Sequence, residues 1–267
     1  NCRQYTFTAV NVYCLQFDSE WNEKEGNFES VSSMLNEHSI EEKSLIVLPE
    51  MFATGFSLNP GLTTFNEPGK TELFLSKLAL EKKSWVIGGM CQPSNVKDMA
   101  YNTAVTFNPL GEKISLYKKI HLIPVLNETK YHLPGKSIES ITIDAFQVTP
   151  AICYDLRFPE LFRLGVKAGA TLFVVLGCWP KSRIEHWVTL LKARAIENQA
   201  YLVGVNRIGK DKEMEYGGKS MIICPKGEVL AGDNEDHGVI EATINQTYVR
   251  KWRNAFPAVM GLSNGEN

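Results

Sequence analysis

Short apolar runs alternate with longer amphipathic stretches along this chain of 267 residues. The apolar runs are rich in β-branched and aromatic residues, which is typical of buried strands. They predict strands at residues 6–15, 45–48, 85–90, 103–107, 114–117, 138–143, 148–153, 171–176, 201–205, 219–224 and 238–244. Each amphipathic stretch is long enough for about two to five helical turns. These stretches predict helices at residues 21–39, 70–83, 159–168, 184–199 and 246–254.

The same order of elements occurs twice along the chain: strand, helix, strand, helix, strand and hairpin. Pro and Gly in the turns at residues 108–111 and 224–227 support the two hairpins. Two mixed sheets that each carry helices on one face can bury their bare faces against each other. The pattern therefore predicts an α/β fold, a four-layer α-β-β-α sandwich of two mixed sheets with an internal pseudo-two-fold repeat.

The chain shows no boundary between separate domains. No linker rich in Pro, Ser or charge divides the two halves, so we expect residues 1–267 to form a single domain. A TIM barrel is the alternative architecture, but the two hairpins break the strand–helix alternation that it requires. The longest apolar run, at residues 170–179, is far shorter than a membrane-spanning helix, and residues 1–4 do not resemble a signal peptide.

Composition and charge exclude several classes of partner. Hydrophobic residues make up 44% of the chain and charged residues 22%, which is typical of a globular protein. With 28 Lys and Arg against 30 Asp and Glu, the formal net charge is −2, and like charges do not cluster. We therefore expect no nucleic-acid partner and no membrane partner.

The cysteines indicate neither a metal centre nor a disulfide scaffold. They form no CxxC pair and have no histidines at zinc-finger spacing, so we expect no metal and a reducing, cytoplasmic location. A free cysteine is most often a buried apolar side chain. We expect this of Cys2, Cys14, Cys91, Cys178 and Cys224.

Three reactive side chains stand at the ends of predicted strands. Glu50 lies at a carboxyl end, where open α/β sheets usually bind ligands, and Lys119 follows a hairpin strand. Cys153 ends a strand and Pro159 opens the next helix, so we expect the thiol to be exposed on a sharp turn. Free backbone N–H groups and a helix N-terminus at that turn would favour a thiolate and an oxyanion.

Other polar groups have structural interpretations. Arg194, Glu197 and Asn198 lie within one turn of a predicted helix, where an ion pair is the expected role. Asp155 and Arg157 could brace the turn that carries the candidate thiol.

The residues alone leave three other functions open. A cysteine protease would pair Cys153 with His121 or His186, but it leaves Glu50 and Lys119 without a role. A four-layer phosphoesterase would need a cluster of Asp, Asn and His for metal and phosphate, and no such cluster stands out. A non-catalytic binding protein on the same scaffold is the third possibility.

Four motifs taken together resemble the nitrilase superfamily of carbon–nitrogen hydrolases. They are LPEMF around Glu50, YKKIHL around Lys119, ICYDLRFPE around Cys153 and ARAIEN at residues 193–198. They stand in the family's order, and the resemblance spans nearly the whole chain. It implies the α-β-β-α sandwich, a Glu-Lys-Cys triad that uses no metal or cofactor, and a homodimer or larger assembly. Glu128 matches the second glutamate that many members place beside the triad.

The segment at residues 179–183, together with the later ARAIENQAY, looks most like the ω-amidase branch. Substrates of that branch are small amides of dicarboxylic 2-oxo acids. The resemblance therefore implies cleavage of a small carboxylate-bearing amide, such as 2-oxoglutaramate or succinamate, to acid and ammonia through a thioester on Cys153. An N-carbamoyl-amine or another aliphatic amide is the alternative substrate within the superfamily.

Three further residues are candidates for binding that substrate. The backbone N–H of Tyr154 would hold the oxyanion together with Lys119. Trp179 ends a buried strand in the second half and could form a wall of the pocket. Arg183 could clamp the distant carboxylate with two parallel hydrogen bonds, although pairing with Glu185 is its alternative role.

Overall fold

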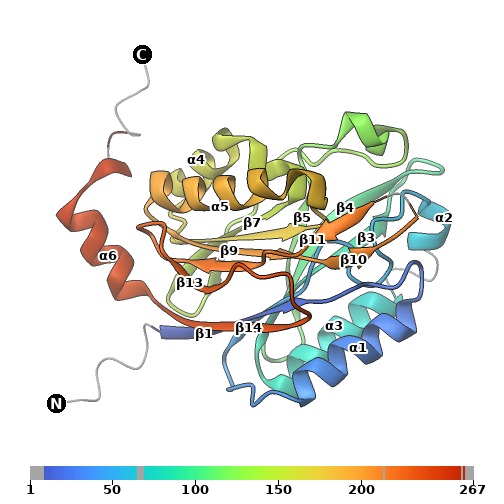
Figure 1. The fold of residues 1–267 in the computed structure, drawn as a ribbon, viewed down its shortest axis with the longest axis horizontal. Coiled ribbons are helices and arrows are strands. Elements are labelled where there is room, and N and C mark those ends of the chain that lie inside the picture. The colour runs from blue at the N-terminus through green and yellow to red at the C-terminus, as the bar shows by residue number, and fades with distance from the viewer. Residues whose placement is uncertain (1–8, 65–68, 213, 260, 262–267) are drawn as a thin grey trace.

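Two six-stranded mixed sheets form the centre of the structure, a computed structural model that describes residues 9–64, 69–212, 214–259 and 261 (Figure 1). The first sheet contains β1 (Ala9–Gln16), β2 (Leu45–Val47), β3 (Trp85–Pro93), β4 (Ala100–Phe107), β5 (Lys113–Lys118) and β14 (Gly238–Asn245). The second contains β6 (Ile141–Ile143), β7 (Phe146–Ile152), β8 (Leu172–Gly177), β9 (Tyr201–Asn206), β12 (Met221–Ile223) and β13 (Val229–Gly232). A separate pair consists of β10 (Ile208–Lys210) and β11 (Glu215–Gly217).

The two sheets repeat one pattern of strand pairing. The first has the order β14-β1-β2-β3-β4-β5, in which β1, β2 and β3 are parallel and the other neighbours antiparallel. The second has the order β6-β7-β8-β9-β12-β13, in which β7, β8 and β9 are the parallel strands. Strand β2 of one half therefore corresponds to β8 of the other. This repeat confirms the predicted internal pseudo-two-fold symmetry.

Helices cover the outer faces of both sheets. Figure 1 shows α1 and α3 on the opposite side of the sandwich from α4 and α5. These helices are α1 (Lys24–Asn36), α3 (Gly69–Lys82), α4 (Pro159–Lys167) and α5 (Ile184–Asn198), with α2 (Pro60–Thr63) and α6 (Gln246–Ala255) at the periphery. The described helices include none with the length and apolar character needed to cross a bilayer.

The alternation of side chains along each strand separates the layers of the core. In β1, Val10, Val12 and Cys14 pack into the core between the two sheets. Tyr13 and Leu15 point the other way, into the layer that the first sheet shares with α1 and α3. The four-layer sandwich thus follows from the alternation of side chains between the two faces of each strand. The TIM barrel is excluded, because the two sheets are open and separate.

The structure differs from the predicted elements mainly in short segments. Residues 6–8 of the first predicted strand lie outside the described residues, and the helix predicted at residues 21–39 is shorter at both ends. The strand predicted at residues 138–143 is regular only over β6. The pattern missed α2, β10, β11 and β13, because three or four partly polar residues give no detectable hydrophobic period.

Candidate active site

Segments that follow strands of both sheets bring together the four predicted catalytic side chains. Lys119 Nζ lies 3.1 Å from Oε1 of Glu50 and 3.0 Å from each carboxylate oxygen of Glu128. These three side chains are fully buried, and Cys153 beside them is 2% exposed. One buried ammonium group is therefore shared between two carboxylates next to a thiol.

Glu50 follows β2 where the backbone passes very close to β3. A Cβ atom on Gly89 of β3 would lie 2.6 Å from Cα of Glu50, so only glycine fits at this point. Hydrogen bonds hold both oxygens of the Glu50 carboxylate. Its Oε1 accepts a 2.7 Å hydrogen bond from Nδ2 of Asn102, and its Oε2 accepts a 2.8 Å bond from the backbone N–H of Cys178.

Glu128 reaches Lys119 from a short 3₁₀ segment, Glu128–Lys130, which follows Asn127 in the left-handed region with φ 57°. Its Oε2 also accepts a 2.7 Å hydrogen bond from the backbone N–H of Ile123. Burial disfavours the charge on Lys119, but Glu128 and Glu50 outweigh it and hold the pKa of Lys119 well above its usual value. Burial likewise opposes the charge on Glu128, but Lys119 lowers the pKa of that carboxyl group.

Cys153 occupies a strained turn directly after β7. Its φ of 47° lies in the left-handed region, which non-glycine residues adopt only where the surroundings enforce it. The next turn is the 3₁₀ segment Cys153–Arg157, and α4 begins only after it, at Pro159. The expected sharp turn is present, but the N-terminus of an α-helix does not directly follow the sulfur.

The expectation of an exposed thiolate at Cys153 is wrong. Burial, together with the negative charge of Glu50, raises the pKa of the thiol well above its usual value, although Lys119 opposes this. The side chain is nearly inaccessible because the turn folds it between the sheets. The raised pKa favours the neutral thiol, so Cys153 needs a nearby base before it can act as a nucleophile.

Groups from α5 and the turn itself hold the backbone after Cys153. Arg194 of α5 donates from Nε and Nη2 to the backbone carbonyl of Leu156, at 3.2 and 2.9 Å. Its Nη1 lies 2.9 Å from Oε1 of Glu197, which confirms the expected ion pair within the helix. Asp155 accepts a 3.0 Å hydrogen bond from the backbone N–H of Ile152 and thus braces the turn as expected.

A cavity of about 220 Å³ opens onto Cys153. Its wall includes all three predicted substrate-binding residues, and the complete lining is Ile123, Val125, Cys153, Tyr154, Arg157, Trp179, Pro180 and Arg183. Trp179 is fixed by three hydrogen bonds. Its backbone N–H donates to Oδ1 of Asn206 at 2.7 Å, its carbonyl accepts from Nδ2 of Asn206 at 3.1 Å, and its Nε1 donates to the carbonyl of Arg183 at 2.8 Å. This rigid indole forms one wall of the space in front of the thiol.

Arg157 also lines this cavity, although the sequence analysis did not predict it as a substrate-binding residue. Its guanidinium carbon lies 4.8 Å from the ring centre of Trp179 and 5.9 Å from that of Tyr154. Its Nη2 also lies 3.3 Å from Nδ1 of His186, so Arg157 links the turn to α5. The position four residues after the thiol was visible in the sequence, but nothing there indicated which way the side chain points.

Neither arginine of the cavity pairs with a carboxylate among the residues that the structure describes. The arginine ion pairs within the described chain are those of Arg163, Arg194 and Arg207. The alternative role of Arg183, pairing with Glu185, is not observed there. Arg157 and Arg183 thus line a small cavity, and neither has a carboxylate partner among the described residues.

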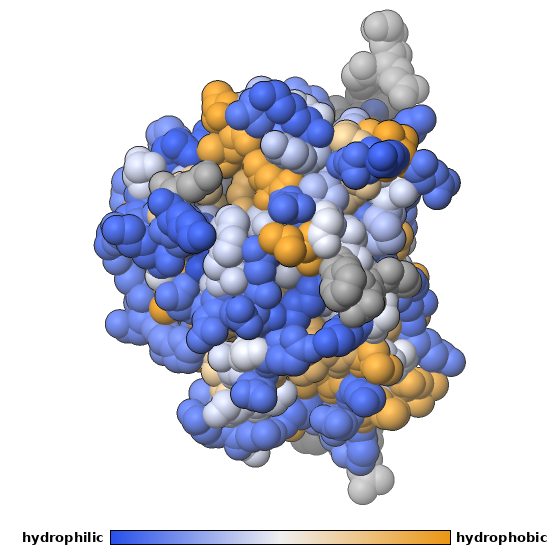
Figure 2. All heavy atoms as spheres, turned by 90° about the vertical axis from the view of Figure 1, so that its right-hand side faces the viewer, coloured by the Kyte–Doolittle hydropathy of each residue, from blue (hydrophilic) through white to orange (hydrophobic). Residues whose placement is uncertain are grey.

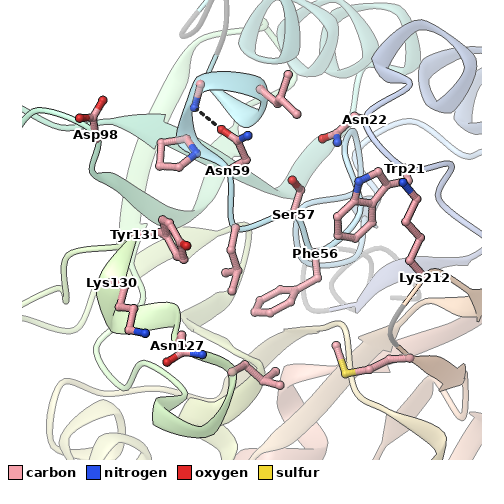
Figure 3. A pocket seen from close by; sticks show the side chains of 16 residues that line it. Trp21, Asn22, Phe56, Ser57, Asn59, Asp98, Asn127, Lys130, Tyr131 and Lys212 are labelled. Atoms are coloured by element: carbon pink, nitrogen blue, oxygen red, sulfur yellow. Dashed lines mark hydrogen bonds between the residues drawn. The ribbon is translucent and has the colours of Figure 1, made fainter.

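A larger cavity of about 850 Å³ lies on the other side of the segment that carries Glu128 (Figure 3). Val125 lines the small cavity, whereas Leu126 lines the large one. Phe56 lines the large cavity, and its ring centre lies 5.6 Å from Nζ of Lys119. No predicted catalytic side chain is among its lining residues. Figure 2 shows this side of the molecule as mostly hydrophilic, with separate apolar patches.

The two histidines considered as bases for Cys153 contact other groups. Nδ1 of His121 lies 2.8 Å from Oδ1 of Asp155, and the ring stacks on Phe158 with centres 3.6 Å apart. His186 contacts Arg157 at the surface. In the portion of the chain that the structure covers, no thiol–imidazole pair of a cysteine protease forms at Cys153. Nor does any set of three His, Cys, Asp or Glu side chains there form a metal site.

The other cysteines fit the expected buried role, with one exception. Cys14, Cys91 and Cys224 are buried free thiols, and Cys2 lies outside the described residues. Cys178 is also buried, but it contacts Glu50. Its thiol donates to the backbone carbonyl of Glu50 at 3.1 Å, and its backbone N–H donates to the carboxylate of the same residue. This contact could not be seen in the sequence, because it joins positions 128 residues apart.

Comparisons with known proteins point to one family. The family profile described as carbon-nitrogen hydrolase matches residues 11–254. The chain is 36% identical to the 2-oxoglutaramate amidase of Paenarthrobacter nicotinovorans, with 82% of this chain and 78% of that protein covered. It is 33% identical to the omega-amidase of Yersinia enterocolitica, with 94% of this chain and 96% of that protein covered.

A solved structure shows the same likeness in three dimensions. A CN-hydrolase superfamily protein from Xanthomonas campestris, solved with an arsenic adduct in its active site, matches with a TM-score of 0.88 at 26% identity. The match covers 97% of this chain and 98% of that one.

Proposed function

The chain belongs to the carbon–nitrogen hydrolase family and is an amidase, and from this premise we propose that it hydrolyses a small carboxylate-bearing amide through a thioester on Cys153. Substrates of this class are 2-oxoglutaramate and succinamate, each with an amide at one end and a carboxylate at the other. The relatives named 2-oxoglutaramate amidase and omega-amidase support this choice.

The observation that carries the proposed substrate class is the pair of arginines beside the nucleophile, neither of which pairs with a carboxylate in the described part of the chain. Arg157 and Arg183 line the same cavity of about 220 Å³ as Cys153. A guanidinium group binds a carboxylate through two parallel hydrogen bonds. A four- or five-carbon acid amide would place its carbonyl at the thiol and its carboxylate at these cations.

Acylation begins with transfer of the thiol proton to Glu50. The pKa of the buried Cys153 thiol is well above its usual value, so the thiolate forms only as this transfer occurs. The sulfur attacks the amide carbon, and the carbonyl oxygen becomes an oxyanion. Lys119 and the backbone N–H of Tyr154 stabilise that charge. Glu50 then protonates the nitrogen, the C–N bond breaks and ammonia leaves, with the acyl group on Cys153 as a thioester.

Deacylation reverses the roles of the same groups. A water molecule in the place of ammonia gives a proton to Glu50 and attacks the thioester carbon. The second tetrahedral intermediate collapses by breaking the C–S bond, and the departing sulfur takes the proton back from Glu50. Glu128 neutralises Lys119 throughout, because both of its oxygens lie 3.0 Å from Nζ. The ammonium group is thereby fixed where the oxyanion forms.

The proposal is tested by comparing specificity constants for succinamate and butyramide, which differ mainly in the terminal carboxylate. Wild type should prefer succinamate. Arg157→Met should lower kcat/KM for succinamate about 30-fold or more, on the scale of a charge pair that loses one partner, and leave butyramide nearly unchanged. Arg183→Met should lose less, about tenfold, because this side chain is more exposed and solvent screens it.

Arg250→Met is the matched control, since Arg250 is an exposed arginine on α6 outside the cavity. It should leave both specificity constants unchanged. A wild-type preference for butyramide or for an N-carbamoyl-amine would contradict the substrate class. An unchanged succinamate-to-butyramide ratio in both arginine variants would remove these cations from the substrate site.

A further inference from the structure

The buried carboxylate of Asp155 accepts four hydrogen bonds from two separate segments of the chain. Oδ2 accepts from the hydroxyl of Tyr117 at 2.7 Å and from the backbone N–H of Ile152 at 3.0 Å. Oδ1 accepts from the backbone N–H of His121 at 2.9 Å and from its Nδ1 at 2.8 Å. The carboxylate has no exposed surface, so these bonds are its means of stabilisation.

The four donors flank the two groups that must meet in the reaction. Tyr117 and His121 stand two residues before and two residues after Lys119. Ile152 directly precedes Cys153, whose backbone is held in the left-handed region with φ 47°. The same carboxylate therefore links the segment that carries the ammonium group to the turn that carries the thiol.

The side chains of this network have little freedom to move. The hydroxyl and ring of Tyr117 are fully buried. The imidazole of His121 stacks on Phe158 with an interplanar angle of 6°, which fixes the direction of its Nδ1 toward Asp155. Because both rings are constrained, loss of one donor cannot be repaired by a simple rotation.

We infer that Asp155 is a positioning residue that holds the nucleophile at its working distance from the ammonium group. It acts through Tyr117 and His121 and touches neither substrate nor the reacting atoms. The inference rests on the proposed function only in taking Cys153 as the nucleophile. Misplacement of reacting groups by about 1 Å can lower a rate by about a hundredfold, so removal of one donor from the network should lower kcat measurably.

The first test changes His121, which donates to Asp155 from its side chain. Iodoacetamide alkylation of Cys153, followed by mass spectrometry of its peptide, reports how readily the thiolate forms beside Lys119, independently of any amide. His121→Ala should slow this alkylation and lower kcat about tenfold, with KM within about twofold of wild type. His121→Asn should restore most of both rates, because its Nδ2 replaces the Nδ1 donor.

The second test removes only a hydroxyl group. Tyr117→Phe should also slow alkylation of Cys153 and lower kcat. Tyr201→Phe is the matched control, since the buried hydroxyl of Tyr201 accepts a 3.2 Å hydrogen bond from the backbone of Asn245, far from the turn. Thermal stability should fall more in Tyr117→Phe, which loses a bond to a buried charge, whereas Tyr201→Phe should keep the wild-type alkylation rate and kcat.

The outcomes separate this inference from the proposed function. Wild-type alkylation rates in both His121→Ala and Tyr117→Phe would overturn the positioning role, and so would an equal loss in Tyr201→Phe or a failure of His121→Asn to restore the rate. If wild type cleaved no amide while the alkylation series followed the expected order, the proposed function would fail and the positioning role would stand.

Discussion

The backbone N–H of Cys178 donates a 2.8 Å hydrogen bond to Oε2 of Glu50. Glu50 follows β2 and Cys178 follows β8, which are corresponding strands of the two halves. The carboxylate is therefore anchored across the interface between the sheets. Its other oxygen, Oε1, accepts from Asn102 and Lys119, so both oxygens face hydrogen-bond donors.

Replacement of this carboxylate by an amide should stop the first chemical step. In Glu50→Gln the side chain can no longer accept the thiol proton. In either orientation its NH₂ group would face a hydrogen-bond donor, because donors contact both oxygens of the native carboxylate. We expect single-turnover acylation, measured by rapid quench, to slow at least about a hundredfold. Acylation at the wild-type rate would show that another group is the base.

Removal of the thiol should abolish turnover and leave the fold intact. Cys153→Ala keeps the same left-handed backbone and loses only a small buried group, so the free energy of unfolding should change by about 1 kcal/mol. Chemical denaturation and amide turnover would be measured on the same preparation. Activity above about a tenth of wild type would contradict the assignment of the nucleophile.

His132 should make the protein less stable as the pH falls from 6.5 to about 4. Burial lowers the pKa of His132 from 6.5 to about 4, so between these values the unfolded chain binds a proton that the folded protein does not. Stability is therefore lost as the pH falls through this window, by up to about 3 kcal/mol. Urea unfolding at several pH values would measure the slope.

The variant His132→Gln should flatten that slope, because glutamine does not titrate and can still place an amide near Cys91, which lies 3.5 Å from Nε2. The control His237→Gln changes an exposed histidine and should keep the wild-type slope. An unchanged slope in His132→Gln would contradict the assignment. The lowered pKa of Glu128 adds a further loss, but only below its ordinary value of 4.5.

Gly89→Ala should damage both stability and catalysis. The new Cβ would lie 2.6 Å from Cα of Glu50 and 2.6 Å from the carbonyl of Pro49, which are backbone atoms that cannot yield easily. We expect a loss of about 1–3 kcal/mol in unfolding free energy, together with a lower kcat. Gly238→Ala is the control, since its Cβ would meet nothing within 4 Å. Equal effects in the two variants would contradict the argument.

Chelation should leave the amidase active. The proposed reaction uses the Glu50 carboxylate, the Lys119 ammonium group and the Cys153 thiol, and no step requires a metal ion. We expect unchanged kcat after dialysis against EDTA, and no increase on addition of zinc. Loss of activity that zinc restores would point to a metal-dependent mechanism instead.

Local patterns predicted the elements and the segments that carry the site. The period of two in β1 and the turn at residues 108–111 depend on near neighbours in the chain, so they can be read without the fold. The motifs around Glu50, Lys119 and Cys153 gave the candidate catalytic side chains for the same reason. The contact of Cys178 with Glu50 could not be found in this way, because it depends on how the two halves pack.

The sequence by itself determined the two-sheet sandwich, its repeat and the candidate reactive groups, because periodicity and motif residues are properties of the chain. Only the tertiary structure decided the burial, the charge pairing and the direction of these side chains. Packing of the sheets buried Cys153 and raised the pKa of its thiol, and it enclosed Lys119 between two carboxylates. It also turned Arg157 into the cavity. Burial, charge pairing and side-chain direction arise from contacts between distant residues, which no local pattern contains.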